Sequence, residues 1–229
     1  LRSGGAALLL YDLGFAVAPA HDALLRRLGL SLPAAVVVDS DRHYASDPKS
    51  VAVTAYESHP VTRRMSLTFY PGVRPLEAVV PANGITREPL FASSDGSHRQ
   101  PLMAALSASA DGAHHPQGSK PPPGPHLLAA AIRGKLDATA EQTFRLIVVG
   151  DSDFVSNSFY PYMSNNRIAL SMVRWLVGET ESASVAPRIP VQPTVELTNY
   201  QRRALFLSLV VALPLTIAGI GALVWWRRR

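Results

Sequence analysis

The sequence contains no cysteine. Disulfide bonds are therefore excluded, and so is a thiolate nucleophile or thiolate metal ligand anywhere in these 229 residues. The absence fits an exported bacterial domain without disulfides, and it fits a cytosolic domain equally well. The composition therefore excludes cysteine chemistry but does not identify the cellular compartment of the protein.

The sequence also lacks the basic runs with interleaved aromatic residues that single-strand binders use. The formal net charge is +5 and the pI is about 9.8. However, Arg202, Arg203, Arg227, Arg228 and Arg229 flank an apolar segment, and the other basic residues are scattered. The charge therefore indicates a membrane topology rather than a nucleic-acid partner.

Residues 204–226 carry no charged side chain, and about 20 such residues are enough to cross a bilayer core. Tyr200 precedes this segment, and Trp225 and Trp226 end it, as expected for side chains at the two membrane interfaces. We predict a transmembrane helix over 204–226. The arginines at both ends leave its orientation undecided under the positive-inside rule.

Residues 144–179 indicate an α/β fold. The apolar residues 146–149 have the length of a buried strand, which ends at Gly150 and is followed at once by Asp151, Ser152 and Asp153. A helix-period pattern comes next. Carboxylates at the C-terminal end of a buried strand, with a helix behind it, form the arrangement in which sites of α/β sheets usually arise. This strand-end turn is the main candidate site.

Two kinds of enzyme chemistry use such a turn, and the sequence argues against both. A serine nucleophile of the GDS-esterase type needs a downstream histidine, but His126 is the last histidine. A phosphatase of the haloacid-dehalogenase type needs a downstream lysine, but Lys135 is the last lysine. The simpler interpretation is that Asp151 and Asp153 accept backbone N–H bonds within the turn. We expect no catalytic residue.

No cofactor or metal site is predicted either. His114 and His115 are adjacent on a polar stretch without a third ligand, and His59 precedes a proline in a predicted turn. Gly4 and Gly5 precede a strand instead of linking a strand to a helix, which is the wrong context for a phosphate-binding loop.

Apolar periodicity predicts further elements along the chain. Helices are expected at 20–28, with Gly29 as a C-terminal cap, and at 167–177, with Asn165 or Asn166 as the N-cap. Strands are expected at 6–11, 36–38, 51–55, 66–70, 76–80 and 144–149, and ordered structure is expected again at 127–132.

Composition divides the chain into four segments. They are an α/β domain over 1–178, a proline-containing linker over 179–203, the membrane helix over 204–226 and a basic end over 227–229. Within the domain, residues 107–125 have almost no large apolar side chain, and we expect a mobile loop there. Residues 1–5 lead directly into an apolar segment, without the methionine or signal segment of a natural start. We therefore expect the chain to be the C-terminal part of a longer protein.

An uninterrupted α-helix would place small residues of the membrane segment on one face. At 100° per residue, Ser208, Ala212, Gly219 and Ala222 fall within about 80° of one another. Helices in lipid associate through close backbone approach at small residues. We therefore predict that this face packs against a helix of another membrane protein.

Several segments follow one another in an order that is known from one protein family. They are residues 2–12, 28–30, 36–39, 59–62, 124–129, 148–154, 156–157, 165–166 and 174–179. The last four are the most specific. Together they resemble the GldG-like auxiliary components of ABC transport systems, a family first associated with gliding motility. The membrane helix that follows fits this family, whereas the polar stretch 107–125 does not match its usual spacing.

The resemblance implies a domain similar in architecture to class I glutamine amidotransferases, with an open, mostly parallel, flavodoxin-like sheet between helices and without the enzyme's chemistry. It implies that this domain lies outside the cytoplasm of a bacterium. The protein would be anchored in the inner (cytoplasmic) membrane, with Arg229 on the cytoplasmic side. The implied partners are a multispanning permease and, through it, a cytoplasmic ATPase.

Our first hypothesis is therefore a non-enzymatic, membrane-anchored auxiliary subunit that binds or scaffolds through its α/β domain. One alternative is a hydrolase or amidotransferase-like enzyme whose nucleophile lies in a missing N-terminal part. Another is an accessory subunit of an unrelated membrane complex. Proteins that co-purify in mild detergent would separate these hypotheses.

Overall fold

The computed structural model describes residues 4–102, 123–136, 142–179 and 199–228. The chain divides into two compact units, Leu1–Ser184 and Val185–Arg229. Most of the stretch 107–125, for which a mobile loop is predicted, lies outside the described residues. The same holds for most of the predicted linker 179–203.

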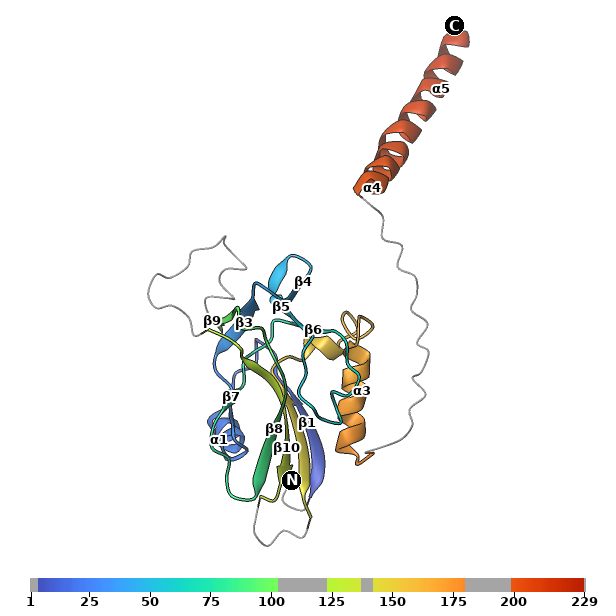
Figure 1. Cartoon of the computed structure of the whole chain (residues 1–229). Coiled ribbons are helices and arrows are strands. Elements are labelled where there is room, and N and C mark those ends of the chain that lie inside the picture. Colours follow the sequence, from blue (N-terminus) through green and yellow to red (C-terminus); the bar gives the residue numbers. More distant parts are fainter. Residues whose placement is uncertain (1–3, 103–122, 137–141, 180–198, 229) are drawn as a thin grey trace. The chain divides into compact units, whose positions relative to one another are not determined.

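The first unit is an α/β domain (Figure 1). Its elements are β1 (Gly5–Leu10), α1 (Pro19–Arg27), β2 (Leu30–Ser31), β3 (Ala35–Asp39), β4 (His43–Tyr44), β5 (Asp47–Val53), β6 (Thr68–Pro71), β7 (Glu77–Ala78), β8 (Ile85–Ala92), β9 (Ser97–Pro101), β10 (Leu127–Gly134), β11 (Phe144–Val149), the 3₁₀ helix η1 (Asp153–Val155) and α3 (Asn165–Leu176).

Four strands form the central sheet, in the order β1-β11-β10-β8. Strands β1 and β11 are parallel, whereas β10 is antiparallel to both of its neighbours. The predicted α/β class is confirmed, but the expectation of a mostly parallel, flavodoxin-like sheet is wrong for these four strands. The connection explains the difference: residues 135–143 join β10 to β11, and a parallel crossover needs a dozen or more residues.

Helices cover both faces of this sheet, with α1 on one side and α3 on the other (Figure 1). On β11, Ile147 and Val149 belong to the apolar cluster that includes α3, and Leu146 and Val148 belong to the cluster that includes α1. All four side chains are fully buried. Because successive strand residues point to opposite faces, a strand covered on both sides has the unbroken apolar run seen in the sequence.

Three smaller sheets pair β3 with β9, β2 with β7, and β5 with β4 and β6. The sequence predicts β3, β5 and β6 but neither β8 nor β9. Strand β8 escapes prediction because Arg87, Glu88 and Pro89 interrupt its apolar pattern. Pro89 lies in an edge strand of the described sheet, the position at which sheets accommodate proline.

Helix α1 agrees with the helix predicted over 20–28. Pro19 is its first residue, Asp22 lies in its first turn, and Leu25 faces the core. Gly29 follows the C-cap residue with φ = 85°, the left-handed conformation that glycine adopts without steric cost.

Asn165 has a different role from the N-cap predicted at position 165 or 166. Ser164 is the N-cap residue of α3, and it makes no side-chain cap bond. The Asn165 amide is fully buried; it accepts a hydrogen bond from the Phe69 N–H (3.1 Å) and donates to the Phe69 carbonyl (3.1 Å). It also donates to the carbonyls of Phe154 and Phe159, both at 3.4 Å. This side chain joins β6 to α3 as a neighbouring strand would.

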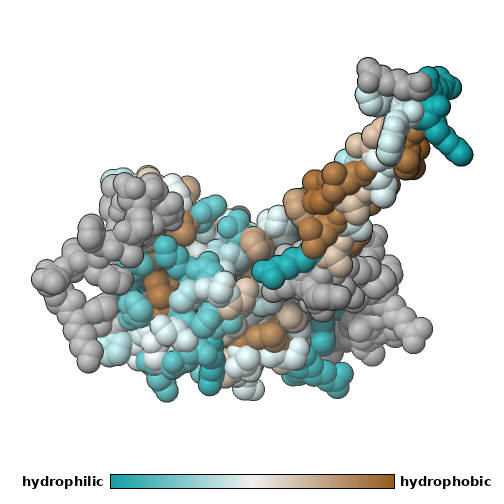
Figure 2. All heavy atoms as spheres, turned by 90° about the horizontal axis from the view of Figure 1, so that it is seen from above, coloured by the Kyte–Doolittle hydropathy of each residue, from teal (hydrophilic) through white to brown (hydrophobic). Residues whose placement is uncertain are grey.

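The second unit contains a helix built of α4 (Asn199–Phe206), the π-helical turn η2 (Leu207–Ala212) and α5 (Leu213–Arg227). Its segment Arg203–Arg227 has 25 residues and none of it is buried. Among the described residues, this is the one helix that is long and apolar enough to cross a membrane. Figure 2 shows apolar side chains along it and hydrophilic ones at its ends.

The π-helical turn lies directly before Pro214. Proline has no N–H, and its ring clashes with the preceding turn of an α-helix. A wider turn relieves the clash, and the Leu213 N–H donates to the carbonyl of Ser208, five residues back. One extra residue in a turn shifts the phase of α5 against α4 by about 100°. The predicted alignment of the four small residues assumed an uninterrupted helix, so their packing against another helix stays a prediction.

The contacts of Asn165 predict a large effect of an isosteric change. In Asn165→Asp, the donor that faces the Phe69 carbonyl becomes an oxygen. We expect the free energy of unfolding to fall by about 1–3 kcal/mol, the penalty of leaving a buried polar group without its partner. Denaturant unfolding of the detergent-solubilised chain measures this change. Asn157→Asp at an exposed position is the matched control, with an expected change within about 0.5 kcal/mol. Equal effects of the two variants would contradict the role assigned to Asn165.

Candidate functional site

The polar motifs of the sequence gather at one edge of the central sheet. Strands β1, β11 and β8 end at this edge, and the antiparallel β10 begins there. The residues brought to it are Asp12 after β1, residues 150–153 after β11, Ser93 and Ser94 after β8, and His126 before β10. Ligand sites of open α/β sheets form outside the carboxyl ends of strands, so this edge is the first candidate site.

Asp151 binds the backbone of its own turn. Its Oδ1 accepts the N–H of Asp153 (3.0 Å) and its Oδ2 accepts the N–H of Phe154 (3.1 Å), where η1 begins. The residue is 2% exposed. Burial raises the pKa of Asp151 to about 8, and the two N–H donors oppose that rise. The carboxyl group therefore has a structural partner on each oxygen.

Ser152 and Asp153 lie beside Asp12 from the neighbouring strand. The Ser152 hydroxyl donates to Asp12 Oδ2 (3.4 Å), and Asp12 Oδ1 accepts the Gly14 N–H (3.3 Å). Burial and the negative charge of Asp12 raise the pKa of Asp153. The serine thus meets a carboxylate instead of the histidine base that the esterase mechanism requires. In the described part of the chain, no group of three His, Cys, Asp or Glu side chains is placed to hold a metal ion.

Gly150 allows another segment to approach the end of β11 closely. Its carbonyl accepts the N–H of Arg74 at 2.7 Å, and its own N–H donates to the Leu128 carbonyl at 3.0 Å. A Cβ atom at position 150 would lie 1.9 Å from the Arg74 carbonyl oxygen. Any other residue would push the two segments apart.

Residues 73–76 therefore cross the strand ends. The Val73 carbonyl accepts the N–H of Val37 in β3 (2.9 Å), and the Leu76 N–H donates to the carbonyl of Leu127 at the start of β10 (2.8 Å). With the bond from Arg74 to Gly150, this segment connects β3, β11 and β10.

The side chain of Arg74 is buried beneath the loops that follow β1 and β2. The residue is 2% exposed, and its guanidinium donates to the carbonyls of Phe15 (2.8 Å), Leu32 (3.4 Å) and Pro33 (3.1 Å). Removal from water lowers the pKa of Arg74. The chain thus places its own backbone and a buried arginine at the edge where an α/β enzyme would bind its ligand.

Tyr11 lies next to this arginine, directly after β1. Its hydroxyl forms a hydrogen bond with Nε2 of His21, and its ring packs against Phe15, with ring centroids 5.7 Å apart. Burial raises the pKa of Tyr11 to about 12, with a smaller opposing effect of Arg74. The phenol is therefore neutral at physiological pH and acts as a hydrogen-bonding group.

The half of the edge formed by β8 contains a buried hydrogen-bond network that sequence reasoning missed. Asp39, at the end of β3, is fully buried and accepts the Ser94 N–H (2.9 Å) and the Ser94 hydroxyl (2.6 Å). It also accepts the N–H groups of Asp41 (3.1 Å) and Arg42 (2.9 Å). Burial would raise the pKa of Asp39, but these four bonds outweigh it and lower the pKa. The available signal was an aspartate that ends an apolar run; Ser94 follows a strand that the sequence does not predict.

His126 brings an imidazole to the same network, but not in the geometry of a catalytic triad. Its backbone N–H donates to the Ser93 hydroxyl (2.8 Å), which lies 2.7 Å from the Ser97 hydroxyl. Its Nδ1 accepts a hydrogen bond from Nε of Arg99 (3.1 Å), and Arg99 forms an ion pair with Glu77. A neutral imidazole that accepts at Nδ1 carries its proton on Nε2, so neither nitrogen is free to take a proton from a serine.

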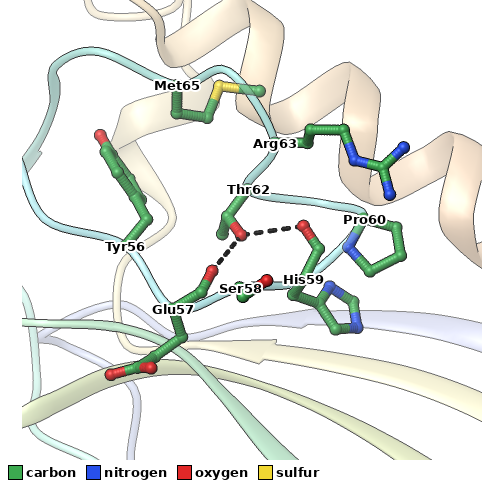
Figure 3. A pocket seen from close by; sticks show the side chains of 8 residues that line it. All are labelled: Tyr56, Glu57, Ser58, His59, Pro60, Thr62, Arg63 and Met65. Carbon is green, nitrogen blue, oxygen red and sulfur yellow. Dashed lines mark hydrogen bonds between the residues drawn. The ribbon is translucent and has the colours of Figure 1, made fainter.

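A pocket of about 510 Å³ lies over the loop between β5 and β6 and is the second candidate (Figure 3). It is lined by Tyr56, Glu57, Ser58, His59, Pro60, Thr62, Arg63 and Met65.

Two polar side chains of this pocket hold the turn together. The Thr62 hydroxyl donates to the carbonyls of Glu57 (2.6 Å) and His59 (3.0 Å), as Figure 3 shows. Nδ1 of His59 accepts the Val61 N–H (3.2 Å), and the ring packs 5.2 Å from Trp175 of α3. Burial lowers the pKa of His59, with an opposing effect of Glu88. Structure and sequence thus agree that His59 serves a turn.

The chain thus contains an α/β domain in which residues 73–76 and the side chain of Arg74 cover the C-terminal ends of the central strands. It also contains a helix that is long enough to span a membrane. Residues 9–176 match the family described as "ABC-type uncharacterized transport system". The matched stretch runs from β1 to the end of α3 and contains every strand-end residue described above. The chain belongs to this family, the auxiliary components of ABC-type transport systems. The apolar C-terminal helix and this family fit an association with a membrane.

The mmIFT52 N-terminal domain has a similar structure, with a TM-score of 0.50 and 16% sequence identity. The similarity covers 81% of this chain and 69% of that chain, and at this identity it shows a shared fold alone. No curated protein matches the chain.

A change at Asp151 tests whether the strand-end turn is structural. In Asp151→Asn, one of the two acceptors becomes a donor that faces an N–H group. We expect a lower thermal midpoint, equivalent to about 0.5–2 kcal/mol, the usual effect of losing a cap bond. Asp153→Asn is the control, and we expect an unchanged or higher midpoint because it relieves repulsion with Asp12. A midpoint that rises with millimolar magnesium in the unmodified chain would indicate metal binding to the folded state and contradict this role.

The raised pKa of Asp151 also predicts a pH dependence. The folded state holds the proton more tightly than the unfolded chain, whose Asp pKa is about 3.9. The resulting stabilisation is complete below that value and is lost as the pH rises toward 8. We expect the free energy of unfolding to fall over this window by at most about 1.4 kcal/mol per pH unit.

The comparison with Asp151→Asn isolates this contribution. Denaturant unfolding at several pH values should give a steeper fall for the unmodified chain than for the variant. Subtracting the curve of the variant from that of the unmodified chain removes the contributions of other titrating groups. One of them is His59, whose lowered pKa makes its contribution to stability rise with pH. Parallel curves would contradict the assignment to Asp151.

Proposed function

We propose that this chain is a GldG-like, membrane-anchored auxiliary subunit of an ABC-type transport system that binds or scaffolds other subunits and catalyses no reaction. Its α/β domain, residues 1–178, lies outside the cytoplasm. Residues 179–203 link this domain to a transmembrane helix over 204–226, and residues 227–229 end in the cytoplasm. The membrane is the inner membrane of a bacterium.

The closed edge of the central sheet carries this proposal. Arg74 and residues 73–76 occupy the strand ends, and the polar groups of the motif bind the chain itself. Ser152 meets an aspartate, and Nδ1 of His126 is engaged by Arg99. Such bonds support a module whose motif residues maintain its shape, because a nucleophile needs a free base within hydrogen-bond reach.

Membership in the family supports the choice of partners. An auxiliary component of an ABC-type transport system associates with that system, and a helix of membrane-spanning length supports contact with its membrane subunit. The partners in this proposal are a multispanning permease and, through it, a cytoplasmic ATPase. The arginines at both ends of the helix do not decide its orientation, so the cytoplasmic C-terminus in this proposal rests on the resemblance to GldG-like components.

Purification from native membranes tests the proposal. The tagged chain, extracted in mild detergent, should enrich an ABC permease and its ATPase in constant proportion through affinity and size-exclusion steps. The matched control is the same chain with residues 204–226 replaced by a leucine-rich span, which should insert but retain less permease. Purification of the chain alone, or with a membrane complex that has no ABC subunits, would overturn the proposal.

A further inference from the structure

The π-helical turn leaves a backbone carbonyl in the membrane helix without a donor from its own helix. The carbonyl of Leu209 would ordinarily accept the N–H of residue 213, or that of residue 214 in a wider turn. The Leu213 N–H donates to Ser208 instead, and Pro214 has no N–H.

Nearby hydroxyl groups do not replace the missing donor. The Ser208 hydroxyl donates to the Leu205 carbonyl (3.0 Å), and the Thr216 hydroxyl donates to the Leu213 carbonyl (2.7 Å). These are the side-chain donors that residues 204–224 contain. Both are therefore committed to other carbonyls of the same helix.

The open carbonyl lies within the hydrocarbon layer of a membrane crossed by this helix. The midpoint of Arg203–Arg227 is Leu215, and Leu209 lies six residues away, or roughly 9 Å along the axis. The hydrocarbon core extends about 15 Å to either side of its centre. A polar group at this depth is not hydrated, and leaving it unpaired is strongly unfavourable.

A neighbouring helix of a different membrane protein can supply the missing donor. Lipid tails contain no donor. A second copy of this chain, packed side by side in the same direction, offers at this depth the hydroxyls of Ser208 and Thr216, which are already engaged. The complementary surface is therefore a helix of another chain that carries a hydroxyl, amide or indole N–H at the matching depth.

We propose that the π-helical turn is the docking point at which this helix binds a membrane-spanning subunit of the ABC-type transport system, through a side-chain donor of that subunit to the carbonyl of Leu209. The inference rests on the proposed function for the identity of the partner. A carbonyl points along the axis toward the residue four positions on, so this group opens beside Leu213.

The first test restores the missing donor. In Pro214→Ala, residue 214 regains an N–H and the helix can pair its backbone internally. We expect the full chain still to insert and its complex with the permease to dissociate about 3- to 30-fold more readily, the range that interhelical hydrogen bonds contribute in membranes. Leu215→Ala is the matched control, because it leaves Pro214 and the backbone pairing of the turn unchanged, and it should retain the complex.

The second test locates the contact without relying on the proline variant. Leu213 and Leu215 both lie in α5, are both exposed, and differ by about 200° around the axis. A photo-cross-linking amino acid at position 213 should form an adduct with the permease. Position 215 lies on the side of Gly219 and Ala222, and the same amino acid there should form less adduct if the permease docks at the π-helical turn rather than on the small-residue face.

The outcomes separate the inference from the proposed function. If the unmodified chain retains no ABC permease, the proposed function fails and this inference fails with it. If it retains the permease but Pro214→Ala and Leu215→Ala bind equally well, the inference is overturned and the proposed function stands. If Pro214→Ala does not insert, the cross-links decide: equal yields at 213 and 215, or an adduct between two copies of this chain, overturn the inference.

Discussion

The backbone hydrogen bond from Arg74 to the carbonyl of Gly150 is the contact on which the architecture of the domain depends. It holds residues 73–76 against the end of β11 at a separation that glycine alone permits. From this point the same segment reaches β3 through Val37 and β10 through Leu127. The small outer sheets are thereby connected to the central one at the edge where an α/β domain would otherwise be open.

Closure of this edge changes what its polar residues can do. A charged arginine removed from water is costly unless it is hydrogen-bonded, and the two terminal nitrogens of Arg74 meet three carbonyls, whereas its buried Nε has no partner among the described residues. Asp39 and Asp151 are likewise buried and bound by N–H groups of nearby turns. Groups that serve as acids, bases or ligand contacts in enzymes of this architecture here determine the conformation of loops. The family of auxiliary transport components, rather than an enzyme family, is in keeping with that use.

The membrane helix follows a different physical rule. In the domain, a lost backbone bond can be replaced by water or by a neighbouring loop, whereas in a bilayer it must be replaced by another protein group. Pro214 therefore has a consequence beyond local geometry, since it forces a wider turn and opens a carbonyl on one side of the helix. The two units of this chain thus contrast: one directs its polar groups inward, and the other has a backbone acceptor at Leu209 without its usual donor.

Local patterns in the sequence were sufficient to predict several elements of this protein. The apolar run before Gly150 identified β11, helix periodicity identified α1 and α3, and the uncharged stretch after Arg203 identified the membrane-length helix. The order of motifs identified the family of transport components. In each case the signal lies in neighbouring residues, because strand alternation, helix period and span length are properties of short segments.

Tertiary structure alone decided the features that join distant segments. The directions of β8 and β10 follow from chain connections, and β8 itself is stabilised by its neighbour although Arg87, Glu88 and Pro89 interrupt its apolar pattern. The role of Asn165 depends on Phe69, and that of Arg74 depends on three loops. Even the phase of the membrane helix depends on how one turn accommodates a proline. These contacts link residues far apart in the chain or alter hydrogen bonding from one turn to the next, and periodicity within a short segment contains no information about either.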